Sequence, residues 1–258
     1  MLARFVSLPP FRALLLAGVA AVALSACATN HPTAMSRVDF AGQPATAQAA
    51  ALSQLGARYK SNPRDKGTIL YYAAALRSAG QPDQAVSVIE GGLTIYKTDP
   101  DLKVAYAKAL SADGRFEQAL NVVDDAIDPA QPDWSALLVK GAILDQSGRN
   151  AEARAIYTQA ELSAPNEAAL EANLGLSYAM TNDLDQAESH LRKAVAMRGA
   201  TSQIRQNLAL VVGLQGRFDE ARQMFAAELP ADQVEANMSY MRALLTQQNR
   251  WDLIKGAK

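Results

Sequence analysis

The chain has 258 residues, of which 49% are hydrophobic, 6% are aromatic and 20% are charged, and its formal net charge is −1. This apolar content is enough for a packed core and excludes wholesale disorder, while the near-neutral charge excludes a strongly basic nucleic-acid-binding surface. Ala, Leu, Gln, Glu and Arg dominate over β-branched and aromatic residues, which favours helix, and the single cysteine excludes an internal disulfide.

The first predicted element is a short apolar segment behind a positive flank. Residues 1–12 contain Arg4 and Arg12 and no acid, and the 14 residues 13–26 contain one polar residue. As a helix this run extends only about 21 Å, short of the ~30 Å hydrocarbon core of a bilayer. Residues 1–26 are therefore predicted to be a signal peptide that is removed on export, which leaves a formal charge of 23 − 26 = −3.

The apolar run ends in Leu24-Ser25-Ala26-Cys27, and Cys27 is the only cysteine. This sequence resembles the bacterial lipobox, in which small residues admit the signal peptidase and the cysteine thiol carries diacylglycerol. The resemblance implies that Cys27 becomes the lipid-modified N-terminus, whose two or three acyl chains anchor a protein stably. By the same analogy, Ala28 favours the periplasmic side of the outer membrane. The alternative is a plain secretory signal followed by a free cysteine.

The next two segments connect this anchor to the folded part. Residues 27–45 show no periodicity and contain two prolines, which predicts a flexible tether with a root-mean-square reach of roughly 25 Å. Residues 46–65 begin with a run of helix-forming residues, and we predict an N-terminal capping helix there.

Residues 66–235 repeat with a period of 34 residues. A Gly or Asn recurs at Gly80, Gly114, Gly148, Asn182 and Gly216. Seven residues earlier the side chain is small, at Ala73, Ala107, Gly141, Gly175 and Ala209, and five residues later it is Ala85, Ala119, Ala153, Ala187 and Ala221. Four residues before the Gly or Asn lies a large apolar residue, at Leu76, Leu110, Leu144, Tyr178 and Val212. A fixed period of this length is typical of a repeat array.

Each repeat is predicted to hold two helices of about 12–14 residues. Gly or Asn supplies the left-handed backbone conformation that ends the first helix, and the small side chains let the two helices approach closely. Prolines between repeats end the second helices, at Pro63, Pro100, Pro132 and Pro165.

These spacings resemble the tetratricopeptide repeat, and residues 134–167 match it best through Gly141, Leu144, Ala153, Tyr157, Ala160 and Pro165. The resemblance implies an all-α tetratricopeptide-repeat solenoid, a right-handed superhelix of helix pairs with five full repeats plus capping helices. Residues 236–258 are expected to form the C-terminal capping helix and tail. Residues 231–254 also look like a partial sixth unit, because residues 249–252 resemble residues 216–219 at an offset of 33.

In such an array the first helices of the repeats are expected to line a concave surface that binds peptides or partner helices. These positions map onto Arg77, Lys108, Asp145, Gln146, Asn173, Met180, Gln203, Gln206, Asn207 and Leu210. Asn173 and Asn207 lie one period apart, where peptide-binding members of the superfamily place an asparagine on the ligand backbone. The alternative is that these asparagines only join neighbouring helices. We predict partner contacts by Lys108, Asn173, Gln203, Gln206 and Asn207.

Residues 203–222, QIRQNLALVVGLQGRFDEAR, resemble the TadD family, the repeat-bearing lipoproteins of the tight-adherence (Flp, type IVc) pilus system. The lipobox, the tether, the repeat count and residues 240–251 are similar too. The resemblance implies an outer-membrane-anchored periplasmic scaffold for assembly of the pilus secretion apparatus, acting as a pilotin-like partner of the secretin. The alternatives are an adaptor that recruits a periplasmic peptidase and a factor for outer-membrane β-barrel assembly.

No pattern in the sequence indicates catalysis. His31 and His190 lie in different contexts without a spaced Cys or carboxylate, so neither a metal site nor a cofactor is predicted. Asp124 and Asp125 are interpreted as solvated surface residues rather than an acid–base pair. There is no phosphate-binding loop and no nucleophile elbow. The sequence thus predicts a protein that is not an enzyme and does not bind nucleic acid, and it leaves the oligomeric state open.

Overall fold

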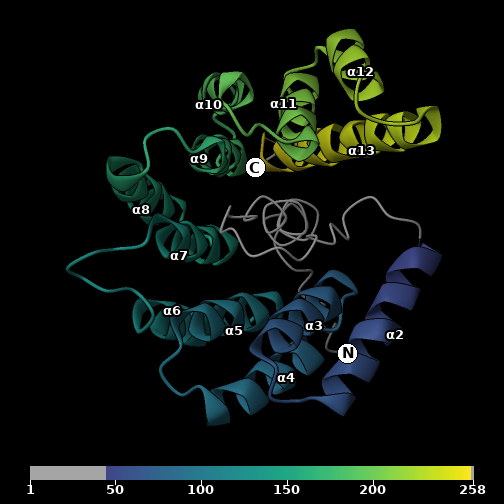
Figure 1. Ribbon diagram of the computed structural model, residues 1–258. Coiled ribbons are helices and arrows are strands. Elements are labelled where there is room, and N and C mark those ends of the chain that lie inside the picture. Colours follow the sequence, from purple (N-terminus) through teal and green to yellow (C-terminus); the bar gives the residue numbers. More distant parts are fainter. Residues whose placement is uncertain (1–44, 257–258) are drawn as a thin grey trace, which may run out of the picture. The chain divides into compact units, whose positions relative to one another are not determined.

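A computed structural model describes residues 45–256, with side chains described for residues 48–246. Within this range the chain forms twelve α-helices, α2–α13, and no strand (Figure 1). The all-α prediction is confirmed. The signal peptide, the lipobox residues Leu24, Ser25, Ala26 and Cys27, and all but the last residue of the tether lie outside the described residues.

The described residues divide into two compact units, of which unit 1 ends at Ala164 and unit 2 begins at Pro165. In unit 1, α2 (Ala45–Ser61) is followed by the pairs α3 (Lys66–Ser78) and α4 (Pro82–Ile95), α5 (Pro100–Ala112) and α6 (Phe116–Asp124), and α7 (Trp134–Gln146) and α8 (Asn150–Ser163). Unit 2 contains α9 (Ala168–Met180) with α10 (Leu184–Ala196), α11 (Ser202–Leu214) with α12 (Phe218–Ala226), and α13 (Ala231–Gly256). Five successive helix pairs therefore occupy the range of the five predicted repeats.

The turn inside each pair is built identically in all five repeats. In the third repeat, Gly148 has φ 83°, its N–H donates to the Asp145 carbonyl at 3.0 Å, and the Arg149 N–H donates to the Leu144 carbonyl at 2.9 Å. These two bonds form the Schellman motif, which satisfies the last carbonyls of the first helix. The left-handed residue is the Gly or Asn that recurs every 34 residues, and Asn182 adopts φ 62° in the fourth repeat.

The small residues of the repeat lie where the paired helices cross. All five alanines of the second helices, from Ala85 to Ala221 at intervals of 34, are fully buried. A Cβ built on Gly175 would lie 2.7 Å from Leu191 Cγ and 2.9 Å from the Ala187 carbonyl oxygen. Two helix backbones can come this close only where one of them carries no side chain.

Two second helices are shorter than the repeat predicts. α6 and α12 contain 9 residues each, whereas α4 and α8 contain 14. A 14-residue helix starting at Phe116 or Phe218 would have to include Pro129 or Pro230 in its last turn. Proline lacks an N–H and disfavours helical geometry at the residue before it, so both helices end early.

The C-terminal helix also differs from the expected partial repeat. α13 runs without interruption from Ala231 to Gly256, through residues 249–252, where the offset copy of the turn sequence lies. Asn249 stands in the place of the turn glycine there but, unlike Asn182, it lies inside a continuous helix.

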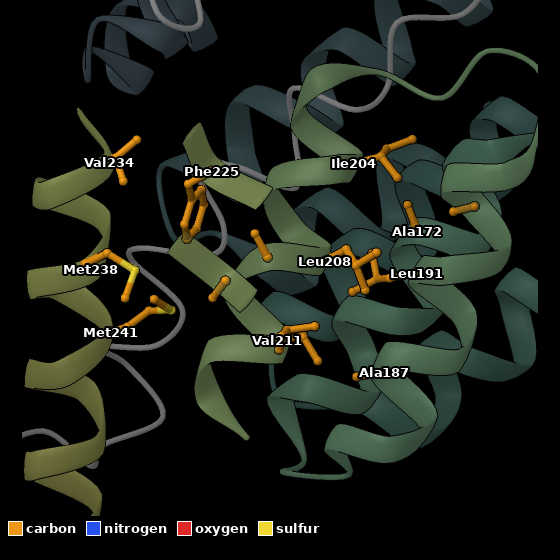
Figure 2. Close-up of a cluster of buried hydrophobic side chains, with 14 of the residues drawn as sticks. Ala172, Ala187, Leu191, Ile204, Leu208, Val211, Phe225, Val234, Met238 and Met241 are labelled. Carbon is orange, nitrogen blue, oxygen red and sulfur yellow. The ribbon is translucent and has the colours of Figure 1, made fainter. Parts of the chain in front are cut away.

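The core of unit 2 is continuous across its helices. Figure 2 shows side chains of α9 and α10 meeting Leu208 and Val211 of α11, and Phe225 of α12 facing Met238 and Met241 of α13. Met238 and Met241 are fully buried. α13 therefore covers the apolar side of the last repeat, as a capping helix must.

Candidate protein-binding site on α9 and α11

The predicted contact residues fall into both units. Asn173 lies on α9, and Gln203, Gln206 and Asn207 lie on α11, which contacts α9 within unit 2. Lys108 lies half-buried on α5 of unit 1. We call the four residues of unit 2 (Asn173, Gln203, Gln206 and Asn207) the amide set.

Asn173 is buried, with 2% of its surface exposed. Its Nδ2 donates to the carbonyl oxygen of Ala169, one turn earlier on the same helix, at 2.8 Å. The asparagine therefore bonds within α9. Among the described residues it forms no hydrogen bond to a neighbouring helix, which the alternative of a helix-joining asparagine would require.

Asn207 is equally buried, with 2% of its surface exposed. Gln203, one turn earlier on α11 and half-buried, donates from Nε2 to Asn207 Oδ1 at 3.2 Å. The Nδ2 of Asn207, in contrast, has no hydrogen-bond partner among the residues that the structure describes. A buried polar group without a partner costs about 1–3 kcal/mol of folding free energy. A purely structural role for Asn207 therefore does not explain why this donor is buried unpaired.

Each of the two helices carries one charged residue, and both are engaged elsewhere. Glu171 of α9 is 2% exposed and accepts bonds from two α10 side chains, His190 Nδ1 at 2.8 Å and Lys193 Nζ. The His190 ring also stacks on Tyr178, with ring centroids 5.3 Å apart.

Arg205 of α11 is held in the same way. It donates to Glu228 from Nε at 2.5 Å and from Nη2 at 3.1 Å, and to the Ala200 carbonyl oxygen at 3.2 Å. The hydrogen bond from Arg205 lowers the pKa of Glu228, so both partners stay charged near neutral pH. The helices of the amide set therefore offer neutral amides and no free charge of their own.

Unit 1 also contains buried polar side chains, on α5 and α7. Ser111 Oγ on α5 donates to Gln146 Oε1 on α7 at 2.7 Å, and Gln146 Nε2 has no partner within the described part of the chain. Asp145 accepts bonds from the Tyr157 hydroxyl at 2.9 Å and from Asn150 Nδ2 at 2.7 Å. Asp145, which the register placed among the binding positions, is thus used inside the third repeat. Nothing in the sequence points to Ser111, because a serine at one copy of a repeat position gives no signal of burial.

The aspartates at the end of α6 pair with lysines of neighbouring helices. Asp124 lies 2.8 Å from Lys140 Nζ, and Asp125 contacts Lys103 Nζ. Both carboxylates are more than half exposed, as expected for surface residues.

Over the described range, no group of three or more His, Cys, Asp and Glu residues is arranged to hold a metal ion. None of the described helices has the length and apolarity that a membrane span requires.

Comparison with known proteins agrees with this architecture. Three models of the tetratricopeptide repeat match the chain, at residues 76–141, 172–203 and 205–227. Among curated proteins, no sequence matches the chain significantly.

Several solved structures share the fold at low sequence identity. A thermophilic tetratricopeptide-repeat protein of Thermus thermophilus is 23% identical, with a TM-score of 0.60 over 69% of this chain and 98% of that one. A tetratricopeptide-repeat protein of Parabacteroides merdae is 13% identical, with a TM-score of 0.63 over 78% and 77%. PilW, a widely conserved type IV pilus biogenesis factor, is 19% identical, with a TM-score of 0.54 over 79% and 91%. With five helix pairs closed by one repeated turn and three matches to the repeat, the described chain has the tetratricopeptide-repeat fold and resembles that repeat in sequence over residues 76–141, 172–203 and 205–227.

Proposed function

We propose that this protein is a non-enzymatic scaffold, anchored by lipid to the periplasmic side of the outer membrane, that helps assemble the secretion apparatus of the tight-adherence pilus. Its partner on this proposal is another protein of the apparatus, and the secretin is the first candidate, with this chain in a pilotin-like role.

The protein-binding part of the proposal is supported most directly by Asn207. Among the described residues its Nδ2 is a buried donor without a partner, on a helix that also carries the amide side chains of Gln203 and Gln206. An asparagine presents both a donor and an acceptor and so matches a peptide group of a ligand. Tetratricopeptide repeats commonly bind other proteins through the first helices of successive pairs, which here include α9 and α11.

The location is supported by the sequence of the N-terminal segment. Leu24, Ser25 and Ala26 precede the only cysteine at the end of an apolar run that is too short to span a bilayer. Acylation of Cys27 would anchor the chain, and residues 28–45 would separate the helices from the membrane surface.

The pilus role is supported by the resemblance of residues 203–222 to the TadD family. PilW adds that a pilus biogenesis factor can have this fold, but at 19% identity the likeness extends to the fold alone.

The pilus role is tested in cells that lack the protein. We expect loss of the detergent-resistant secretin multimer, restoration by the wild-type chain, and failure of restoration by Cys27→Ala. Normal multimers in the deletion strain would show that the secretin does not depend on this chain.

The anchor is tested separately by membrane fractionation. Cys27→Ala is expected to release the protein from the membrane and to abolish fatty-acid labelling. Ala28→Asp is the matched control, because it retains the acylated cysteine and is expected to shift the protein to the inner-membrane fraction. Continued labelling of Cys27→Ala would exclude Cys27 as the acceptor.

A further inference from the structure

We propose that one end of unit 1, where α2 and α4 end, lies on the anionic phospholipid headgroups of the membrane that anchors the chain. The inference rests on the proposed function, because it assumes that acylated Cys27 holds the protein at a membrane. It goes further by giving the helical part a membrane-facing surface of its own. The residues that carry it are four exposed cations, which we call the basic set: Arg58, Lys60, Arg64 and Lys97.

The charges of the basic set are unpaired. Many cations of the described helices bind a carboxylate, as Arg149 binds Glu152. Among the exposed cations of residues 48–246, six form no ion pair, and four of these are the basic set. The other two are Arg198 and Arg242 in unit 2. Unpaired positive charge is therefore concentrated at one end of unit 1.

The fold of unit 1 brings the basic set together. α2 and α4 both pack against α3 and run antiparallel to it, so their last turns lie at the same end of the unit. Arg58 and Lys60 lie in the last turn of α2, and Lys97 lies two residues after the end of α4. The Tyr96 hydroxyl donates to the carbonyl oxygen of Arg64 at 2.8 Å, which joins the residue before Lys97 to the loop after α2.

The carboxylates at this end are already bound within unit 1. Asp65 caps α3 by accepting from the Thr68 N–H at 3.0 Å. Lys66 Nζ donates to Asp99 and Asp101 at 2.5 and 2.8 Å. Together with the basic set, these residues give five cations and three aspartates, a net charge of +2, whereas the chain without its signal peptide carries −3. This end of unit 1 therefore attracts a negatively charged surface, although the whole protein is acidic.

An exposed apolar side chain lies at the same end. Ile95, the last residue of α4, is 42% exposed, and it is one of three large hydrophobic residues that are exposed among residues 48–246. It lies one turn after Gly91, where an added Cβ would be 3.2 Å from the Tyr59 hydroxyl of α2. Cations around an apolar side chain suit the headgroup region, because the charges meet phosphates while the apolar group meets acyl chains. Nucleic acid or free phosphate would bind the charges but offer Ile95 nothing apolar.

The length of the N-terminal segment allows this contact. α2 contains 17 residues, so its C-terminal end lies about 25 Å from Ala45. The 17 residues 28–44 between Cys27 and α2 can span at most about 60 Å. They can therefore reach from the bilayer to the start of α2 while the other end of α2 faces the headgroups. On this inference, residues 28–44 hold the start of α2, and not the whole of unit 1, away from the membrane.

The experiment measures vesicle binding of the mature chain, residues 27–258, with Cys27→Ala, so that no acyl chain contributes. Flotation compares vesicles of phosphatidylcholine with vesicles that also contain about 30 mol% phosphatidylglycerol. We expect binding to the anionic vesicles alone, with half-saturation at roughly millimolar lipid in about 50 mM NaCl, and binding at least about tenfold weaker in about 500 mM NaCl.

Substitutions then locate the contact. Replacing all four residues of the basic set by glutamine should weaken binding at least about tenfold, because each cation near an anionic surface contributes about fivefold. Arg198→Gln combined with Arg242→Gln is the matched control, because it removes the other two exposed unpaired cations, and it should change the affinity less than about twofold. Ile95→Ser should weaken binding about threefold. Circular dichroism checks that each variant is folded.

The possible failures are distinguishable. No binding to the anionic vesicles, equal binding to both kinds of vesicle, or an equal loss in the matched control would overturn the inference. Displacement by inorganic phosphate at constant ionic strength would show a site for free phosphate instead of a membrane surface. An unchanged affinity of Ile95→Ser would overturn the part given to Ile95. None of these results affects the proposed anchor, which is tested independently by fatty-acid labelling of Cys27.

Discussion

Gly141 of α7 lies directly against the ring of Tyr157 on α8, so closely that a Cβ added to the glycine would come within 2.3 Å of Tyr157 Cε1. The ring has no room to move aside, because Tyr157 is fully buried and its hydroxyl donates to Asp145. In the third repeat, α7 and α8 thus pack against each other through a glycine, which has no side chain, and the large ring of Tyr157.

Gly141→Ala is therefore expected to destabilise the protein. Overpacking a filled core costs about 1–3 kcal/mol, which outweighs the ~1 kcal/mol that alanine gains over glycine inside a helix. Gly67→Ala in the first turn of α3 is the control, because its new Cβ meets nothing closer than 3.8 Å, and this variant should leave stability unchanged or slightly raised. Urea unfolding midpoints of both variants check this, and similar shifts in the two would contradict the packing described here.

Substitutions at two turn residues, Gly148 and Asn182, are expected to differ in their effect on stability. A Cβ at Gly148 meets no atom within 4 Å, so Gly148→Ala introduces no steric clash with other residues. The alanine should lower the free energy of unfolding only through the strain of its left-handed backbone at φ 83°, by about 1–2 kcal/mol. Asn182→Gly relieves the same constraint at φ 62° and should leave stability unchanged or slightly raised. Thermal melting followed by helical circular dichroism measures both changes, and an unperturbed melt for Gly148→Ala would mean that this turn is not left-handed in solution.

The 34-residue period in the sequence predicted those parts of the fold that recur in every repeat. The turn residue inside each helix pair, and the small residues that bring the two helices of a pair together, could be located, since a backbone with positive φ or a close approach admits few side chains. Gly199, which also has positive φ at 92°, lies outside the period and was missed. The lengths of α6 and α12 were also missed, because the period takes no account of Pro129 and Pro230.

Side-chain roles at the candidate site were less predictable. Asn173 and Asn207 share a position in the repeat, yet one bonds its own helix and the other keeps a free donor. The residue one turn earlier also differs, since Ala169 offers only its carbonyl to Asn173, whereas Gln203 donates from its side chain to Asn207 Oδ1. A shared position in the repeat therefore does not fix the partner of the side chain.

An ion-pair network between the fourth and fifth repeats predicts acid sensitivity. Burial of Glu188 opposes its ionisation, but hydrogen bonds from Arg217, Arg192 and Gln215 prevail and lower its pKa. A depressed carboxyl pKa contributes stability above the unfolded-state value of about 4.3, and that stability is lost as pH falls through the folded-state pKa.

Glu188→Gln should therefore cost about 0.5–1 kcal/mol at pH 7, and the gap to wild type should close below about pH 4. Unfolding midpoints measured across this range provide the test. A gap that widens in acid would contradict the sign derived from Glu188.

The central claim, that α9 and α11 bind another protein, is tested most directly by site-specific photo-cross-linking in intact cells. A photoreactive residue in place of Gln206 on α11 is compared with one in place of Gln223, an exposed glutamine on α12. We predict a discrete adduct with one partner from position 206 and none from position 223. No adduct from position 206, or the same adduct from both positions, would contradict the claim.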